Sequence, residues 1–301
     1  MTKIISFLPF FLLLSAFSFS QTKVILLGTG TPNPDPEHAG SSVAILVNNN
    51  VYLVDFGAGI VRQAAKMTPQ YGGEFPQLEA KNLKIAFLTH LHSDHTVGLP
   101  DLLLTPWVLE RNVPLEIYGP VGTEHLASNI IEAYSADIDY RLNGLEPANE
   151  NGWNANVHEF NRDGLIYSDS LVKVEAFKVE HGSWPNAFGF RFTTPDKTIV
   201  ISGDTRPCEN ILKYAKGADI LIHEVYSYAG WKKRDDFWKK YHAANHTSTY
   251  ELGEMAAKAK PGKIVLYHLL FWGAGEKDLL KEIAEKYDGK VIAGKDLMVL
   301  E

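Results

Sequence analysis

The sequence is poor in cysteine and carries no excess of positive charge. Cys208 is the only cysteine among 301 residues, so no disulfide can form within the chain. Lys and Arg number 29 against 36 Asp and Glu, a formal charge of −7, which excludes a uniformly basic surface but not a local basic groove. Hydrophobic residues at 45% and charged residues at 22% exclude a disordered chain and a polytopic membrane protein.

The first twenty residues have the pattern of a secretory signal peptide. Lys3 is a short positive segment, Ile4–Phe17 is largely apolar, and Ser18 and Ser20 are small residues placed for cleavage before Gln21. An uncleaved membrane anchor is the alternative, but the apolar run is short for a span of about 20 residues. We therefore expect a signal peptide at residues 1–20 and a mature domain at residues 21–301. The mature chain would be periplasmic or secreted and free of the membrane.

Apolar runs of strand length recur along the mature chain, with helical patterns between several of them. Helical periodicity predicts helices at Gly122–Ile138, Thr249–Lys260 and Glu276–Tyr287, and the stretch Asn143–Gly164 is the most loop-like. No repeat or linker is visible, which favours a single domain. The expected strands are rich in Val, Ile and Phe and are bounded by turn residues: Lys23–Leu27, Val43–Val47, Val51–Val54, Lys84–Leu88, Leu171–Val179, Phe188–Phe192, Thr198–Ile201, Ile220–Ile222 and Lys263–Tyr267.

Four side chains that can bind a metal lie within six residues, directly after the expected strand Lys84–Leu88. His90 and His92 are two apart in extended chain and point to the same side, and Asp94 and His95 follow as the chain turns into a helix expected from Thr96. Such a cluster can serve two adjacent metal ions. A polar surface loop with incidental histidines is the alternative, but histidine is too infrequent to make that arrangement a plausible accident.

The segment His-Leu-His-Ser-Asp-His resembles the His-x-His-x-Asp-His signature of the metallo-β-lactamase superfamily. The resemblance covers Thr22 to Glu301 and includes Leu27–Pro32 and Val54–Gly57, which are similar to early strand-and-turn motifs of that superfamily. It implies an α/β fold, the four-layer αβ/βα sandwich of the metallo-β-lactamase type. His181, the segment Ser202–Thr205 and His268 are similar to the remaining motifs, in the same order.

The resemblance also implies a dinuclear metal site. One ion would be held by His90, His92 and His181, and Asp204 would bridge it to the second ion. Three histidine ligands are typical of zinc, so we expect two divalent ions, with zinc favoured. Asp94 would orient or deprotonate the attacking water as well as bind metal. The predicted ligands are His90, His92, Asp94, His95, His181, Asp204 and His268.

Two further segments resemble the ribonuclease Z and arylsulfatase group within the superfamily. His223-Glu224-Val225 and His246-Thr247-Ser248 are similar to its His-Glu-Ala-Thr and His-Ser-Thr motifs. The resemblance implies that Glu224 and His246 form a proton relay, a task that suits a carboxylate beside an imidazole. A structural role for His246 at the start of the next helix is the alternative. The predicted catalytic residues are therefore Asp94, Glu224 and His246.

Two aromatic features are open to two interpretations each. Trp184, Tyr226 and Trp272 follow predicted site residues closely, and they would either wall an apolar pocket or pack in the core. The segment Trp231–Tyr241 carries five Lys or Arg and two Asp among aromatic residues. A solvated amphipathic helix is the ordinary interpretation, and a basic rim that attracts an anionic substrate is the alternative.

The substrate class is predicted mainly from what the chain lacks. Only 22 residues separate His181 from Asp204, too few for the tRNA-gripping insertion of typical ribonuclease Z, and export would remove the enzyme from tRNA. We therefore predict an exported hydrolase of small sulfate or phosphate esters that uses a metal-bound hydroxide, with nucleic acid disfavoured as a partner. The alternatives are a ribonuclease Z-type phosphodiesterase that processes tRNA 3′ ends, and a metal-binding protein without turnover. The oligomeric state stays open, a homodimer included.

Overall fold

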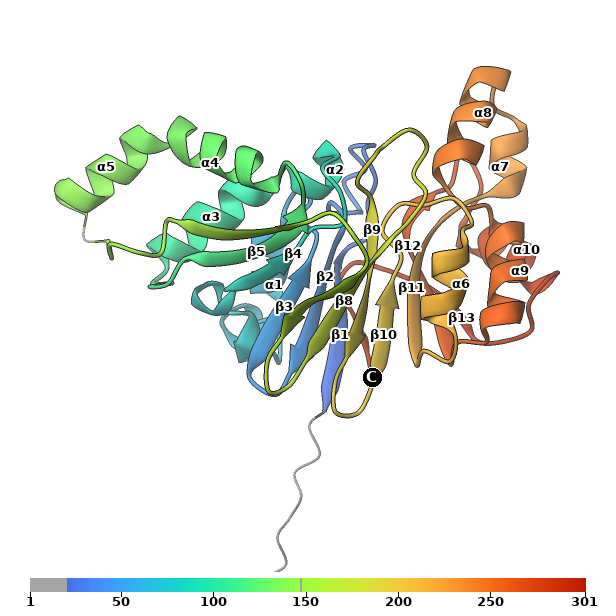
Figure 1. Cartoon of the computed structure of the whole chain (residues 1–301), viewed down its shortest axis with the longest axis horizontal. Helices are drawn as coiled ribbons and strands as arrows, with labels where there is room; N and C mark the ends of the chain where they lie inside the picture. The colour runs from blue at the N-terminus through green and yellow to red at the C-terminus, as the bar shows by residue number, and fades with distance from the viewer. Residues whose placement is uncertain (1–20, 147) are drawn as a thin grey trace, which may run out of the picture.

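Two seven-stranded β-sheets form the centre of the molecule (Figure 1). The computed structural model describes residues 21–301 except residue 147, so the predicted signal peptide lies outside the described residues. The first sheet, in spatial order, consists of β14 (Met298–Leu300), β1 (Thr22–Gly28), β2 (Ser42–Val47), β3 (Asn50–Val54), β4 (Ile85–Phe87), β5 (Leu115–Pro120) and β6 (Ala155–Phe160). The second consists of β13 (Val291–Ala293), β12 (Lys263–Leu270), β11 (Ile220–Tyr226), β10 (Thr198–Ile201), β9 (Phe188–Thr193), β8 (Lys173–Lys178) and β7 (Gly164–Ser168).

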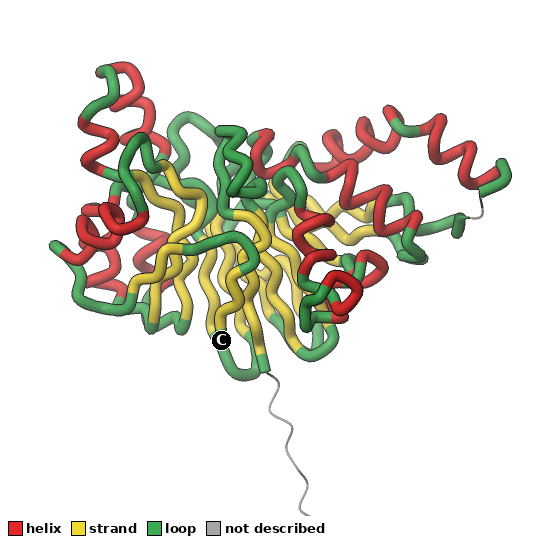
Figure 2. Tube along the Cα trace, turned by 180° about the vertical axis from the view of Figure 1, so that it is seen from behind, coloured by secondary structure: helices red, strands yellow, loops and turns green. Residues whose placement is uncertain are grey.

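Helices cover the outer faces of the two sheets, which Figure 2 shows from behind. The first sheet is followed or flanked by α1 (Ile60–Lys66), α2 (Ser93–Thr96), α3 (Leu99–Val108), α4 (Thr123–Ala133) and α5 (Ser135–Asn143), with short 3₁₀ turns at Pro69–Tyr71, Pro76–Leu78 and Ala80–Asn82. The second has α6 (Glu209–Ala215), α7 (Tyr228–Lys232), α8 (Asp236–Asn245), α9 (Thr249–Ala259) and α10 (Glu276–Ala284). In the part of the chain that the structure describes, no helix has the length and apolar character needed to cross a membrane.

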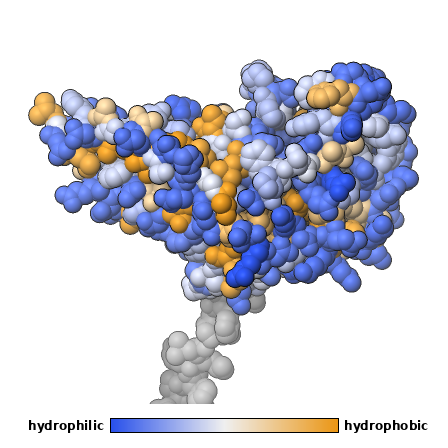
Figure 3. Space-filling view, turned by 45° about the horizontal axis from the view of Figure 1, so that its top comes forward, coloured by the Kyte–Doolittle hydropathy of each residue, from blue (hydrophilic) through white to orange (hydrophobic). Residues whose placement is uncertain are grey.

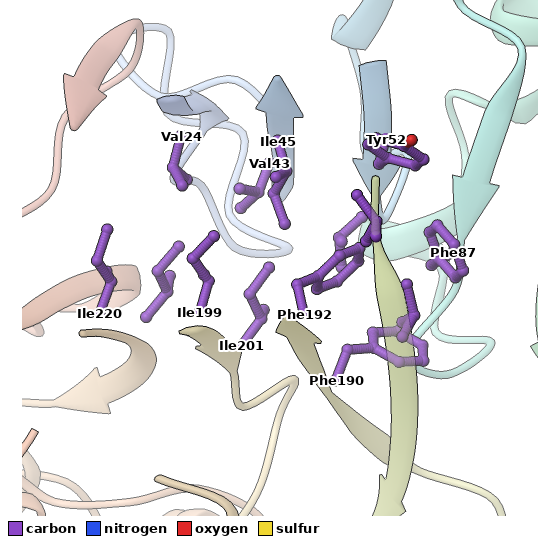
Figure 4. Close-up of a cluster of buried hydrophobic side chains, with 14 of the residues drawn as sticks. Val24, Val43, Ile45, Tyr52, Phe87, Phe190, Phe192, Ile199, Ile201 and Ile220 are labelled. Carbon is purple, nitrogen blue, oxygen red and sulfur yellow. The ribbon is translucent and has the colours of Figure 1, made fainter. Parts of the chain in front are cut away.

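The two sheets pack face to face over a core of branched and aromatic side chains. Figure 4 shows Val24, Val43 and Ile45 of the first sheet opposite Ile199 and other residues of the second. Neighbouring residues of the same strands point outward and pack in separate clusters with the helices. Because the central strands are buried on both faces, they read as continuous apolar runs rather than alternating ones. The predicted four-layer αβ/βα sandwich is confirmed.

Each expected strand is present, but three other expectations need correction. The helix expected over Gly122–Ile138 is two helices, α4 and α5, which meet at Tyr134. The loop-like stretch Asn143–Gly164 contains β6, an edge strand paired in parallel with β5. Half of its side chains face solvent, so its composition resembles that of a loop. The helix expected from Thr96 begins earlier, at Ser93.

The topology brings several chemically active segments to one end of the sandwich. Strands β10, β11 and β12 are parallel neighbours, and β4 runs parallel to β3 and β5 in the other sheet. Residues just beyond the carboxyl ends of parallel strands meet at one edge of a sheet, where ligands bind in open α/β folds. His90 follows β4, Asp204 follows β10, and Glu224 and His268 lie near the ends of β11 and β12.

Candidate metal centre

All seven predicted metal ligands lie together at this edge, in two adjoining groups. The first group is His90, His92 and His181, and the second is Asp94, His95, Asp204 and His268. Within each group, one nitrogen or oxygen of every member lies within 4.8 Å of the others. The residues come from four separate parts of the sequence, so the arrangement is a product of the fold and not of the local segment at residues 90–95 alone.

The three histidines of the first group converge on one point. His92 Nδ1 lies 3.0 Å from His90 Nε2 and 3.1 Å from His181 Nε2. In a tetrahedral zinc site with Zn–N bonds of about 2.0–2.1 Å, ligand nitrogens are about 3.3 Å apart, so the spacing fits a metal. Burial lowers the pKa of His92 to about 4 and holds the pKa of His90 well below its usual range. The rings are therefore neutral at pH 7, the form that binds a metal.

The second group contains two carboxylates and two imidazoles. Asp94 Oδ2 lies 3.1 Å from His268 Nε2 and 3.5 Å from His95 Nε2. Burial disfavours a charged ring, but the surrounding carboxylates together outweigh this effect and raise the pKa of both His95 and His268, with Asp204 contributing most and Asp94 adding to it. The buried Asp204 and the half-buried Asp94 thus create a site that favours positive charge, which protons or a cation can supply.

Asp204 is the member of the second group that also faces the first. Its Oδ1 is 3.4 Å from His95 Nε2, while its Oδ2 is 3.5 Å from His268 Nε2 and 4.0 Å from His90 Nε2. Within the described chain, Asp204 Oδ1 and His95 Nε2 are buried and have no hydrogen-bond partner. Buried polar atoms without partners are costly, so these atoms fit a site completed by a cation. The donor set matches the divalent metal ions that the resemblance implies.

Residues outside the two groups fix the orientation of the ligand rings. His95 Nδ1 donates a 2.7 Å hydrogen bond to Asp55, whose carboxylate also accepts from the backbone and side chain of Thr89. His181 Nδ1 donates to the carbonyl oxygen of Asn245 at 2.7 Å. Such contacts set which ring nitrogen faces a metal. The motif Val54–Gly57 pointed to the position of Asp55 without giving it a role, and nothing in the sequence indicated the Asn245 carbonyl.

Unusual backbone geometry places two of the ligands. His268 has φ 46° and interrupts the pairing of β12 with β11, where Glu224 pairs with Tyr267 but Val225 pairs with Leu269. The resulting bulge turns the imidazole out of the strand pattern and toward the site. Gly203 precedes Asp204 at φ 62°, and a Cβ there would lie 2.7 Å from the Phe188 carbonyl oxygen, so only glycine fits.

Glu224 and His246 lie beside the two groups and close to each other. His246 Nδ1 is 3.3 Å from Glu224 Oε1 and 3.9 Å from Asp204 Oδ2, without the alignment of a hydrogen bond to either. Burial and the nearby Asp204 charge raise the pKa of Glu224 well above its usual range, and burial lowers the pKa of His246 to about 4. His246 is not the N-cap of α9, because Ser248 caps that helix in a capping box with Glu251.

His246 also has the geometry of an additional ligand. It forms a third group with His181 and Asp204, and a fourth with Glu224 and His268, each within 4.8 Å.

The aromatic residues divide between the two interpretations left open. Trp184 flanks the three-histidine group, with its ring centroid 4.2 Å from that of His92, whereas Tyr226 is buried in the core.

Known proteins share both the fold and the sequence pattern. Residues 50–269 match the family described as "Beta-lactamase superfamily domain". "Ribonuclease Z" of Mycobacterium marinum is 32% identical over 295 residues, covering 93% of this chain and 98% of that protein. This chain belongs to the ribonuclease Z branch of the metallo-β-lactamase superfamily. Human tRNase Z, short form, has a TM-score of 0.67 at 25% identity, covering 93% of this chain and 98% of that one. The fold is also that of YhfI, a metallo-β-lactamase fold protein of Bacillus subtilis (TM-score 0.71, 19% identity, covering 93% of this chain and 100% of that one).

Membership of this branch makes the chain a metal-dependent hydrolase of ester bonds that uses divalent metal ions. It also corrects the predicted substrate. The prediction that the substrates are small sulfate or phosphate esters was wrong, because the relatives matched over nearly their whole length are named ribonuclease Z. That prediction relied on the expected export of the chain and on two quantities, the 22 residues between His181 and Asp204 and the total charge of −7. Neither quantity describes the local surface beside the site.

Proposed function

We propose that this chain is a ribonuclease Z-type phosphodiesterase that cleaves RNA near its 3′ end. The names of the relatives support an RNA substrate, with tRNA precursors as the first substrates to test. The observation that carries the proposal is the position of the Glu224–His246 pair, in which His246 Nδ1 lies 3.9 Å from Asp204 Oδ2 and 3.3 Å from Glu224 Oε1. The pair would serve as a proton source, and neither main ligand group needs it. A site built for metal storage alone has no use for such a pair.

The two ligand groups would hold two divalent ions, for which zinc is our candidate. Bound there, the ions would supply an activated water and neutralise charge on the phosphodiester. His90, His92 and His181 are neutral donors, whereas Asp94 and Asp204 bring negative charge. Asp94 belongs to the second group, with its Oδ2 3.5 Å from His95 Nε2, and its carboxylate can accept a proton from the attacking water.

The Glu224–His246 pair would protonate the departing oxygen. Burial and the Asp204 charge raise the pKa of Glu224, while burial lowers the pKa of His246 to about 4, so the carboxyl group is the member of the pair that favours a proton. The backbone N–H groups of Thr205 and Thr247 donate to Glu224 Oε1 and hold the carboxyl group in place. A proton passed from Glu224 through His246 would leave Glu224 as a carboxylate, His246 neutral and the leaving oxygen protonated and neutral.

The test is cleavage of a tRNA precursor with a 3′ trailer by the metal-loaded chain beginning at Gln21. We expect release of the trailer without a 2′,3′-cyclic phosphate, because water and not the neighbouring hydroxyl is the nucleophile. Asp204→Asn should lower the rate by several orders of magnitude, whereas Asp288→Asn, a matched change on the exposed surface, should cleave as the unaltered chain does. If the fully metal-loaded chain cleaves neither this RNA nor a small diester, the proposal is contradicted and the chain is a metal-binding protein without turnover.

We also propose, from the sequence pattern alone, that residues 1–20 are removed on export. The intact mass of the chain recovered from outside the cytoplasm should correspond to a protein beginning at Gln21. Retention of residues 1–20, or recovery only from the cytoplasm, would contradict this. An exported chain would be separated from tRNA in the cell, so this proposal bears on which RNA the chain meets there. The cleavage test, which uses the chain without those residues, measures the reaction alone.

A further inference from the structure

Helices α7 and α8 stand out from the body of the molecule beside the candidate metal centre (Figures 1 and 2). The connection between them and the site is direct. Asn245, the last residue of α8, accepts a hydrogen bond from the predicted ligand His181, and His246 follows it. The C-terminal end of α8 therefore lies next to the ligand groups and the proton-relay pair.

A groove with a volume of about 620 Å³ runs between α8 and the loop that follows His181. Phe237, Lys240 and Tyr241 line it from α8, and Gly182 and Arg206 line it from the body. Gly182 is adjacent to His181 and Arg206 is two residues from Asp204. The groove thus extends from a helix on the surface to the edge of the candidate metal centre.

The aromatic residues of α8 are unusually open to solvent. Phe237 is 72% exposed, Trp238 is 40% exposed and Tyr241 is 39% exposed. Their rings form a chain, with centroids 5.4 Å apart between Phe237 and Trp238 and 5.6 Å apart between Trp238 and Tyr241. Figure 3 shows a small hydrophobic patch within the largely hydrophilic surface at this end of the molecule. Aromatic faces exposed in this way are typical of binding surfaces.

The same segment is the basic part of an acidic chain. Trp231–Tyr241 carries five Lys or Arg against two Asp, whereas the whole chain has 29 Lys and Arg against 36 Asp and Glu. Lys239 pairs with Asp236 at 3.4 Å, but Lys240 has no carboxylate partner among the described residues. Exposed aromatic rings interleaved with cations match single-stranded nucleic acid, whose bases stack and whose phosphates need positive charge.

We propose that this groove binds a single-stranded segment of the RNA substrate and leads it to the metal centre. The inference rests on the proposed function. The rings of Phe237 and Tyr241 would stack on bases, and Lys240 would contact the backbone phosphate between them. The groove would then supply the RNA grip that the short segment between His181 and Asp204 has no room to provide. The basic-rim interpretation of Trp231–Tyr241 is the one the geometry favours.

The first test is the affinity of the chain for a fluorescent, unstructured polyadenylate oligonucleotide, measured by anisotropy with EDTA present to prevent cleavage. Phe237→Ala and Tyr241→Ala should each weaken binding by at least about 5-fold, the loss expected when a stacked base loses its aromatic partner. Tyr241→Phe keeps the ring and should keep the affinity. Tyr140→Ala, at an exposed tyrosine on α5, is the matched control and should bind as the unaltered chain does.

The second test separates the charge from the rings. Lys240→Gln should make the slope of log affinity against log salt shallower by about 0.7, the value for one phosphate contact on a single strand. Tyr241→Ala should weaken binding without changing that slope. Lys84→Gln, at an exposed lysine at the start of β4 and so at the other end of that strand from His90, should change neither quantity.

The groove and the proposed function can fail separately. If the chain cleaves no RNA but the groove variants still weaken oligonucleotide binding, the proposed reaction is wrong and the groove stands. If the chain cleaves a tRNA precursor and the groove variants bind and cleave RNA normally, the groove assignment is overturned and the surface is left to a protein partner. We expect the groove variants to lose more activity on RNA than on a small phosphodiester.

Discussion

The carboxylate of Asp55 lies 2.7 Å from Nδ1 of His95 and determines which nitrogen of that ring faces the metal centre. Both residues are buried, and Asp55 itself is held at φ 57° by the turn that follows β3. A carboxylate can only accept from the ring, so Nδ1 carries the proton and Nε2 is left free to bind a metal.

Replacing Asp55 with Asn should therefore weaken metal binding without touching a ligand. An amide can donate to Nδ1 and so favour the wrong form of the His95 ring, and loss of such a partner typically costs 10–100-fold in metal affinity. Competition with a chromogenic chelator would measure the loss, and circular dichroism would check that the variant is folded. A folded Asp55→Asn protein with unaltered metal affinity would show that this contact does not support the metal site.

His246→Ala should leave the bound metal in place and slow turnover, by about 10²–10⁴-fold if His246 protonates the leaving group. The loss should be smaller for a nitrophenyl diester than for an alkyl diester, because nitrophenolate needs little protonation. Glu224→Gln should show the same trend more mildly. Loss of metal from His246→Ala would instead identify His246 as a ligand, a role its position near His181 and Asp204 allows. Equal losses on both diesters with a lowered Tm would make it structural.

Arg111 should be one of the strongest single contributors to stability. Its guanidinium is fully buried and donates to the backbone carbonyl oxygens of Leu83, Leu102, Leu103 and Gly152, at 2.7–3.0 Å. Arg111→Met would leave these acceptors without partners, at a cost of roughly 3 kcal/mol or more in the free energy of unfolding.

Chemical denaturation would measure that cost against a matched change. Arg62→Met breaks an ion pair with Asp101 at 3.2 Å, in which the arginine is 79% exposed, and should cost less than about 1 kcal/mol. Comparable effects of the two substitutions would contradict the role assigned to Arg111.

Asp169 should make the free energy of unfolding depend on pH in the acidic range. It accepts hydrogen bonds from the hydroxyl groups of Tyr52 and Tyr167 and from two backbone N–H groups. Burial opposes ionisation, but these bonds outweigh it and lower the pKa of Asp169. Because the pKa is lower in the folded state, the stabilisation is complete above the unfolded value of about 3.9 and is lost as the pH falls through the folded value.

The measurement compares the Tm of the unaltered chain with that of Asp169→Asn, from pH 7 to below about pH 4. The variant should melt at a lower temperature at pH 7, and the difference should shrink below about pH 4. A difference that grows as the pH falls would reverse the sign of the linkage.

The strands and the grouping of the ligands could be predicted from the sequence, because both depend on strong local signals. Val24 and its neighbours form a continuous apolar run, as strands buried on both faces do, and His90–His95 follows such a strand. Strand β6 was not predicted, because half of its side chains face solvent at a sheet edge and its sequence resembles that of a loop. The contact of His181 with the Asn245 carbonyl joins positions 64 residues apart and depends on tertiary packing alone. The groove along α8 could not be predicted either, because its two walls are remote in sequence and meet only through tertiary packing.

The most direct test of the central claim is a titration of the metal-free chain with zinc, in which bound metal and cleavage of a tRNA precursor are measured in the same samples. We expect about two ions per chain, with cleavage that rises as the second ion binds, and fewer ions and almost no cleavage for Asp204→Ala. Cleavage that persists at full rate in EDTA, or an Asp204→Ala protein with unchanged metal content and activity, would contradict a dinuclear metal-dependent phosphodiesterase.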